Sequence, residues 1–341
     1  MPMPSDELIA FKRIAALIDT VHTVAISGHT DPDGDALGSV LALTGIIESR
    51  WPGVRVQPLL ANDRPVMAAY RFLPGADRLM PAAAYDAVPD LFISVDTPMP
   101  ERLCDARAVL ERAPMTAAFD HHPTMEPFAQ VNCLRASAAS VGDIICDFMD
   151  FLEVEPSPEV ATAILTAVLT DTGRFQYQNT NAHALEVAAA MVAAGASCAE
   201  VSESVYQSYS LPALKLRERA LAHLGTDEHG LIAYSYVTQE DLTALGATAE
   251  DCDSLIDVPR SLRGAKGCLF LREQVSGSVR GSVRSKVDWL DVSAVAQRFG
   301  GGGHRAAAGF TAQGPITAVL EAAVQALLEQ VAIDEAKEGV R

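Results

Sequence analysis

Residues 28–35 read Gly-His-Thr-Asp-Pro-Asp-Gly-Asp and directly follow the apolar run at 24–27. The stretch places one imidazole and three carboxylates close together in the chain. Carboxylates this crowded repel one another unless cations lie between them. Two further clusters, at Asp96 and at 120–122, also follow short β-type runs. Three such clusters at strand ends predict one metal site at the edge of a folded sheet.

The first half of the chain alternates short apolar runs with helical patterns. Strands are expected at 24–27, 54–60, 91–95 and 117–119, and helices at 36–49, 141–152, 158–169 and 181–195. Continuous apolar runs between helices favour a mostly parallel sheet covered on both faces. In such sheets the carboxyl ends of the strands form the ligand-binding crevice. Asp35, Asp96 and His121 all lie just past a strand.

The pattern changes near residue 230. Helices at 199–206 and 211–224 precede β-type runs at 231–237, 268–271 and 278–283. A chain of 341 residues is also too long for one ordinary core. We therefore expect an α/β fold with a catalytic domain over 1–201, a helical linker over 202–226 and a smaller α/β domain over 227–341.

Composition narrows the class of protein. The formal charge of −18, from 26 basic and 44 acidic residues, argues against a general duplex-DNA binder. Only the segment 255–305 is basic, with nine Lys and Arg against four Asp and Glu, so an anion is expected there. The six cysteines are scattered and predict reduced thiols. No signal peptide is expected at the N-terminus. The most apolar helical stretch, 187–199, is too short to span a membrane, so no membrane span is expected. We therefore predict a cytoplasmic enzyme.

The carboxylates and imidazoles suit a pair of divalent ions. Asp33, Asp35, Asp96 and Asp171 supply four negative charges, which two such ions would neutralise. Oxygen and imidazole ligands without thiolates favour Mn²⁺, with Mg²⁺, Fe²⁺ or Co²⁺ as alternatives. Two ions about 3.5–4 Å apart generate hydroxide at neutral pH and clamp a phosphoryl displacement. A lone Asp after a strand more often caps a helix. The ordered set HxxxDxD, D, DHH and DTG favours the metal site.

The segments GHTDPDGDALGS, SVDTP, FDHHP and LTDTG resemble the DHH phosphoesterase family, whose members are dinuclear metal hydrolases. Residues 301–309, GGGHRAAAG, match the GGGHxxAAG signature of the DHHA1 domain. The resemblance covers nearly the whole chain in the expected order. It implies a DHH domain over 1–201 and a substrate-binding DHHA1 domain over 227–341.

The resemblance also implies the metal ligands. They are His29, Asp33, Asp35, Asp96, His121 and Asp171. Asp96 would bridge the ions, with His29 and Asp33 on one ion and the remaining three residues on the other.

Two neighbours of the ligands receive catalytic roles by the same resemblance. Asp120 would orient an imidazole by a hydrogen bond. His122 would face the substrate phosphate, where it stabilises charge or protonates the leaving oxygen. Asp31 is not a family ligand and is interpreted as a turn-forming residue before Pro32.

A second group of residues is expected to bind substrate. It comprises Arg280, Arg284, Ser285, Gly302, Gly303 and His304. Alternation along a strand puts Arg280, Ser282 and Arg284 on one face, and the glycines with His304 form an anion cradle. An edge strand with solvated charges is the alternative for Arg280. A substrate phosphate is expected to bridge the two domains.

The chain is most similar to the stand-alone oligoribonuclease and PAP phosphatase type of the family. The implied substrates are short single-stranded RNA such as pApA, linear dinucleotides, and 3′-phosphoadenosine 5′-phosphate (PAP). Cyclic di-AMP phosphodiesterase and small-bisphosphate phosphatase are the enzyme alternatives. A nucleotide-sensing protein with a vestigial site is the non-enzyme alternative. The polarity of attack, the base-stacking residues and the oligomeric state, with a homodimer as one option, are left open.

Overall fold

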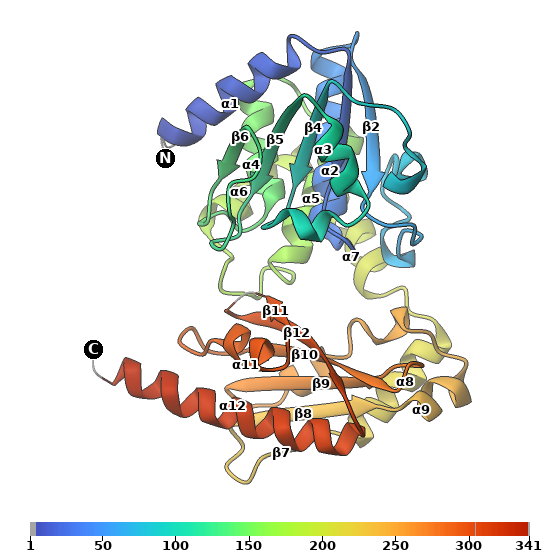
Figure 1. Ribbon diagram of the computed structural model, residues 1–341, viewed down its shortest axis with the longest axis vertical. Helices are drawn as coiled ribbons and strands as arrows, with labels where there is room; N and C mark the ends of the chain where they lie inside the picture. Colours follow the sequence, from blue (N-terminus) through green and yellow to red (C-terminus); the bar gives the residue numbers. More distant parts are fainter. Residues whose placement is uncertain (1–4, 304, 340–341) are drawn as a thin grey trace. The chain divides into compact units, whose positions relative to one another are not determined.

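The structure is a computed structural model that describes residues 5–303 and 305–339. The chain divides into two compact units, Met1–Ser208 and Tyr209–Arg341. Each unit holds one six-stranded sheet and its own helices (Figure 1). The expected α/β class is confirmed. The finer division at residues 201 and 226 stays a prediction.

The sheet of the first unit is parallel throughout. Its order is β3 (Met80–Pro81), β2 (Arg55–Leu60), β1 (Thr23–Ser27), β4 (Leu91–Val95), β5 (Met115–Asp120) and β6 (Val131–Leu134). The strand order reverses beside β1, because β2 lies on one side of it and β4 on the other. A reversal of this kind opens a crevice at the carboxyl ends of the two strands.

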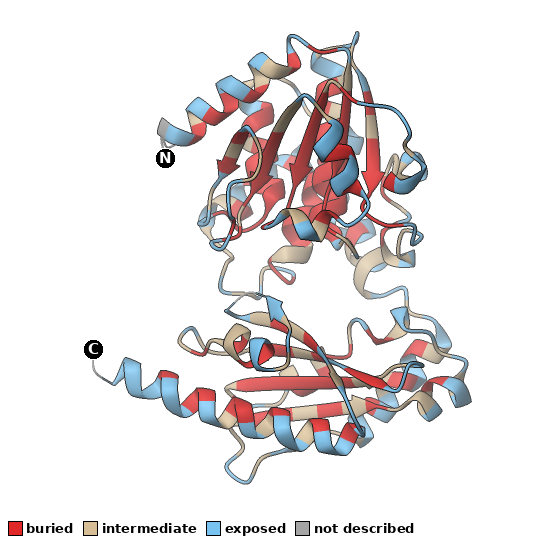
Figure 2. Ribbon diagram, in the orientation of Figure 1, coloured by how far each residue is buried: buried red, intermediate tan, exposed pale blue. Residues whose placement is uncertain are grey.

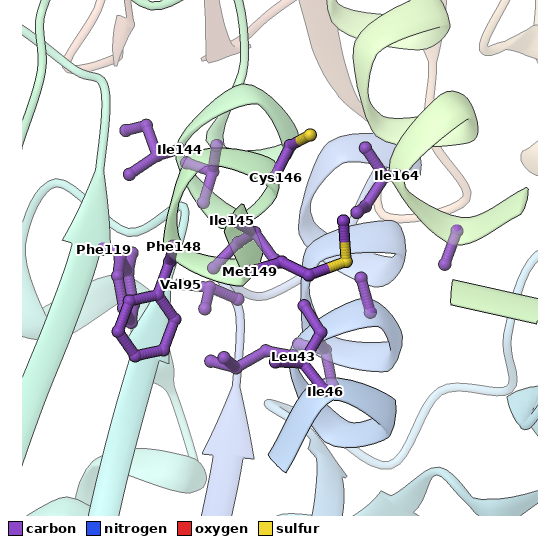
Figure 3. Packing of buried hydrophobic residues seen from close by; sticks show 14 of the residues in the cluster. Leu43, Ile46, Val95, Phe119, Ile144, Ile145, Cys146, Phe148, Met149 and Ile164 are labelled. Carbon is purple, nitrogen blue, oxygen red and sulfur yellow. The ribbon is translucent and has the colours of Figure 1, made fainter. Parts of the chain in front are cut away.

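Helices cover both faces of this sheet. They are α1 (Ser5–Ile18), α2 (Gly34–Arg50), α3 (Ala106–Arg112), α4 (Val141–Phe151), α5 (Pro158–Asp171), α6 (Ala182–Ala193) and α7 (Cys198–Tyr206). The larger core packs α1, α2, α4 and α5 against one face, with Phe11, Phe119 and Phe148 in ring contact (Figure 3 shows part of it). Helix α3 covers the other face. The central strands β1 and β4 are buried on both sides, as their continuous apolar runs predict (Figure 2).

Several elements of the first unit give no clear signal in the sequence. Strand β3 has only two residues. Strand β6 has only four, and the polar Asn132 interrupts its apolar run. Helices α1 and α3 also go beyond the expected set. Helix α5 extends past the expected end at 169 to include Asp171.

The sheet of the second unit is mixed. Its order is β11 (Gly302–Gly303), β12 (Ala307–Gln313), β10 (Ser278–Ser285), β9 (Gly267–Glu273), β8 (Ile232–Val237) and β7 (Gly225–Thr226). Only β8 and β9 pair in parallel. Its helices are α8 (Leu211–Ala222), α9 (Gln239–Leu245), α10 (Asp257–Arg260), α11 (Val292–Arg298) and α12 (Ile316–Glu338). Helices α11 and α12 pack on one face, and α8 and α10 on the other.

Helix α12 lies outside the stretch 187–199, which the sequence predicts to be the most apolar helical stretch. It is long and apolar enough to span a membrane, with a mean hydropathy of 1.5 over 18 residues. Helices α6 and α7 meet the same test only as a pair bent by 111°. The buried positions of α12 recur every three or four residues, among them Val319, Ala323 and Leu327. This stripe packs on the second sheet, as in the core helix of a globular domain.

Candidate metal centre

The loops after β1, β4 and β5 and the end of α5 bring all six expected ligands together. Three overlapping sets of side chains each bring their ligand atoms within 4.8 Å of one another. Two of these sets together contain the six expected ligands. These two sets are His29 with Asp33 and Asp96, and Asp35 with His121 and Asp171. The third set joins Asp96, His121 and His122. The first set has the three residues that the resemblance implies for one ion. The second has three of the four residues implied for the other ion and lacks Asp96, so the ligand scheme stays a prediction.

Asp96 lies between the two imidazoles. Its Oδ2 is 3.5 Å from Nε2 of His29, and its Oδ1 is 3.6 Å from Nε2 of His121. Asp96 adopts a left-handed φ of 52°, which a non-glycine residue adopts only where its surroundings enforce it. Its amide donates to the carbonyl of Phe119 across β5, at 3.0 Å. Both of its carboxylate oxygens therefore face potential partners, one on each side.

The two imidazoles are held by backbone carbonyls. Nδ1 of His29 lies 2.8 Å from the carbonyl of Thr30, and Nδ1 of His121 lies 3.3 Å from that of Ala138. A carbonyl only accepts, so each Nδ1 donates and each Nε2 lone pair points to the carboxylates. Distances of 3.5–3.9 Å from Nε2 to carboxylate oxygens are too long for hydrogen bonds. An imidazole lone pair and a carboxylate oxygen that face each other at this distance are arranged as two ligands of one cation would be.

Asp35 is fixed by the start of another helix. Its two carboxylate oxygens accept from the amides of Val141 and Gly142 at the N-terminus of α4, at 2.8 and 3.0 Å. The hydroxyl of Ser39 donates to Oδ1 at 3.1 Å. Helix N-termini favour negative charge. The side chain is thus oriented from three directions while it faces the other ligands.

Asp33 has two roles at once. Its Oδ1 accepts from the amides of Asp35 and Ala36, both at 3.1 Å, and so caps α2. The same oxygen lies 3.8 Å from Nε2 of His29, and the side chain is 54% exposed. The capping role that a lone Asp suggests and a position in the ligand cluster therefore coexist.

Asp171, the last residue of α5, is held by Asn179. The amide nitrogen of Asn179 donates to the carbonyl of Ala139 at 2.8 Å and to the carbonyl and Oδ2 of Asp171 at 3.0 and 3.2 Å. Sequence patterns miss Asn179, because the segment before it is irregular. Three successive residues, 173–175, adopt left-handed φ angles between 54° and 64°.

Close packing of α2 on α5 sets the separation of Asp35 and Asp171. A Cβ at Gly38 would lie 2.4 Å from the carbonyl oxygen of Ala163, and one at Gly34 would lie 2.5 Å from the side chain of Thr170. Only glycine fits at these two positions without a shift of backbone or side chain. Their spacing of four residues is a signal of close helix approach that the sequence carries.

Asp120 and His122 form a hydrogen-bonded pair beside the ligands. Oδ1 of Asp120 lies 2.6 Å from Nδ1 of His122 and also accepts from the amides of His121 and His122. Both side chains are buried. This contact leaves Nε2 of His122 for another partner.

The cluster carries an excess of negative charge. Burial raises the pKa of Asp35, and repulsion from Asp96 and Asp171 raises it further. Burial and repulsion from Asp33 and Asp96 likewise raise the pKa of Asp171. Burial opposes the charged form of His29, but attraction to the nearby carboxylates of Asp33 and Asp96 outweighs it and raises the pKa of His29 as well. Groups that take up protons in this way are groups that a metal ion would neutralise instead.

The expected substrate residues of the second unit lie on and near β10. Arg280 is exposed, and Ser282 and Arg284 share its face of the strand. Nη1 of Arg284 donates to the carbonyl of Val283 at 3.0 Å. Ser285 is on the opposite face, and its hydroxyl donates to the carbonyl of Val287 at 2.6 Å.

Gly302 and Gly303 form the exposed short strand β11, which pairs with Gly309 and Ala308 of β12. His304 lies outside the described residues. In the first unit, Asp31 has a left-handed φ of 51° and pairs with Arg64 at 2.6 Å, which fits a turn-forming residue.

Comparison with known proteins agrees with this geometry. The profile of the DHH family N-terminal domain matches residues 23–170, and that of the DHHA1 domain matches residues 231–333. The chain contains a DHH family N-terminal domain and a DHHA1 domain. The two matches cover every described strand except β7, and five of the six candidate ligands.

Three relatives show how far the similarity extends. The bifunctional oligoribonuclease and PAP phosphatase NrnA of Thermus thermophilus is 28% identical over 299 residues, 85% of this chain and 84% of that protein. The cyclic-di-AMP phosphodiesterase GdpP of Geobacillus thermodenitrificans is 28% identical over 306 residues, 84% of this chain but 44% of that protein. The crystal structure of an exopolyphosphatase-related protein from Bacteroides fragilis superposes with a TM-score of 0.89 at 22% identity, over 96% of this chain and 98% of that one. The last comparison shows that the fold is shared.

Proposed function

We propose that the chain is a metal-dependent phosphoric ester hydrolase that acts on short oligoribonucleotides and PAP. The observation that carries the proposal is the convergence of six carboxylate and imidazole ligands at the carboxyl edge of one parallel sheet. The similarity over most of its length to a relative named for these two activities supports the substrate class.

The donor set suits two divalent ions, with Mn²⁺ preferred and Mg²⁺ or Co²⁺ as alternatives. His29, Asp33 and Asp96 would hold one ion, and Asp35, Asp96, His121 and Asp171 the other. The ligands combine oxygen and imidazole nitrogen without thiolate, and their buried charges repel one another without cations. Bound divalent ions lower the pKa of water and polarise phosphoryl oxygens.

Within this scheme Asp120 and His122 act on the substrate. Asp120 fixes the ring of His122 through Nδ1, and Nε2 would donate to a phosphoryl oxygen or protonate the leaving ribose oxygen. A buried carboxylate that accepts from an imidazole also stabilises the imidazolium form during proton transfer. We propose His122 as the catalytic acid and Asp120 as its positioning residue.

The remaining phosphates of the substrate would bind in the DHHA1 domain. We propose Arg280, Arg284, Ser285, Gly302, Gly303 and His304 as contacts. The short basic segment in a chain of charge −18 supports a ligand with few phosphates over a polymer such as duplex DNA. A cytoplasmic location, no membrane partner and a homodimer belong to the same proposal.

The test is a product time course with pApA, longer RNA, PAP and cyclic di-AMP at increasing Mn²⁺. We expect metal-dependent hydrolysis of pApA and PAP, and no turnover after EDTA treatment. Turnover of cyclic di-AMP alone would favour the activity that the name of the GdpP relative states. Turnover of PAP alone would favour a small-bisphosphate phosphatase. Nucleotide binding without hydrolysis at saturating metal would favour a sensor and overturn the proposal.

A further inference from the structure

Arg102 lies beside the metal-binding cluster without being one of its ligands. It belongs to the short helix η4 (Pro100–Leu103), which follows β4 and Asp96. Its Nη2 is 3.2 Å from Nδ1 of His29. Its own carbonyl accepts from the amide of Thr30 at 2.7 Å, so the backbone holds η4 against the loop that carries His29.

The approach of Arg102 to His29 does not satisfy the guanidinium. Nδ1 of His29 lies 2.8 Å from the carbonyl of Thr30 and must carry a proton to donate to it. A guanidinium has donors only, so in this tautomer two N–H groups face each other. The opposite tautomer would protonate Nε2, the nitrogen that faces Asp33 and Asp96. The tautomer that suits the ligand cluster therefore leaves Arg102 in need of an acceptor.

Arg102 also differs from its neighbours in its charge partners. No carboxylate oxygen of the described residues lies within 4.0 Å of its side-chain nitrogens. Arg107, five residues later, pairs with Glu101 at 3.2 Å and with Glu111 at 2.9 Å. Arg64, on the loop after β2, pairs with Asp31. Arg102 is half-buried and has no carboxylate partner among the described residues, so an anion that binds beside it would gain a charge-assisted hydrogen bond.

We propose that Arg102 binds the phosphoryl group that undergoes hydrolysis, and so is a further catalytic residue. The inference rests on the proposed function and identifies a cation that the DHH domain itself contributes. Four ligand carboxylates balance the charge of two divalent ions and leave no net positive charge for an incoming phosphate. The planar guanidinium adds one charge and two parallel donors that match two phosphoryl oxygens. Such donors gain strength as charge develops on those oxygens during displacement.

The test compares Arg102→Ala and Arg102→Lys with wild type on pApA and PAP. Arg102→Ala should lower kcat/KM by about 10²–10³-fold, the loss typical of one donor to a developing oxyanion. Arg102→Lys keeps the charge but loses the fork, so it should recover only part of that loss. Arg107→Ala is the matched control, because it removes a paired arginine of the same segment, and it should keep wild-type activity.

Mn²⁺ affinity, measured by calorimetry, separates this role from one of holding His29 in place. A substrate-binding arginine leaves Mn²⁺ affinity unchanged, whereas a residue that positions His29 would weaken it. The inference is overturned if Arg102→Ala keeps wild-type kcat/KM, or if its loss disappears at saturating Mn²⁺.

Binding of AMP to the Mn²⁺-loaded protein keeps the inference separate from the proposed function. Arg102→Ala should weaken this binding at least tenfold, whether or not the wild type hydrolyses any substrate tested. An inactive wild type whose AMP affinity depends on Arg102 would contradict the proposed function alone. An active wild type with equal AMP affinity in both proteins would contradict the role of Arg102 alone.

Discussion

The carboxylates at the edge of the first sheet and the arginines on β10 differ in how firmly the chain holds them. Asp35 and Asp96 are 1% and 3% exposed, and backbone groups fix their positions from several directions. Arg280 is exposed, and its side chain makes no hydrogen bond to any residue that the structure describes. Metal ligation tolerates little error in ligand position, whereas attraction between a guanidinium and a phosphate persists over several ångströms. The two regions should therefore respond differently to substitution.

The largest effect should follow Asp96→Ala. Loss of the carboxylate that faces both imidazoles should lower kcat by more than about 100-fold, the upper range for residues that only support metal ligands. Steady-state kinetics on pApA at saturating Mn²⁺ measures the loss, and circular dichroism checks that the fold is intact. A folded Asp96→Ala protein with wild-type kcat would remove the basis of the metal centre.

A smaller loss should follow Asn179→Ala, which leaves every ligand in place. Its amide ties Asp171 to the loop of Ala139, next to the carbonyl that orients His121. Loss of such support typically lowers metal affinity or activity by about 10–100-fold. Mn²⁺ titration and kcat should both report it. Gln178→Ala, an exposed neighbour, is the control, and equal behaviour of the two variants would contradict the positioning role.

Arg284→Ala should mark the contrast with the second unit. Because the residue is proposed to bind a phosphate away from the reacting bond, its loss should raise KM about tenfold and leave kcat within a few-fold. Arg284→Lys should retain most of the affinity, since charge matters more here than ligand geometry. A fall in kcat at unchanged KM would instead place Arg284 at the reacting phosphate.

The same contrast explains what sequence can predict. The positions of Asp35, Asp96 and His121 follow from apolar strands that end in polar residues, because parallel strands align their carboxyl ends. Asn179 does not follow from any period, since it depends on a left-handed turn at 173–175 and a contact 40 residues back in the chain.

Close approaches between distant segments are hidden in the same way. The glycines at 34 and 38 signal a close helix approach, but the partner Ala163 and the contact of Arg102 with His29 depend on how helices and loops pack. Strand β6 and helix α12 escape prediction for a different reason. The first has four residues, one of them the polar Asn132, so it lacks a continuous apolar run. The second has apolar residues on nearly every side, so it lacks the helical period.

The smallest effect is a pH dependence of stabilisation by metal. Raised pKa values mean that Asp35, Asp171 and His29 retain protons to higher pH in the metal-free fold. Protonated Asp35 and Asp171 stabilise the metal-free folded state at low pH, because their pKa values are higher in the fold than in the unfolded chain. This stabilisation is lost as the pH rises through the raised pKa values. Metal binding must displace these protons at low pH and displaces fewer at high pH. The rise in Tm caused by Mn²⁺, relative to EDTA, should therefore be larger at pH 7.5 than at pH 5.5.

Each tenfold loss of apparent affinity corresponds to about 1.4 kcal/mol, or roughly 3–6 °C in Tm for a domain of the first unit's size. Thermal denaturation at both pH values measures the difference. Asp96→Ala is the control, because a protein with a disrupted site should show little metal-dependent shift at either pH. An equal or larger shift at pH 5.5 in wild type would mean that metal binding displaces no protons. A group other than a proton would then balance the excess negative charge of the ligand cluster in the metal-free protein.

Arg280→Ala should leave the metal-dependent shift in Tm unchanged at both pH values. Arg280 lies in the second unit and takes no part in the protonation of the ligand cluster.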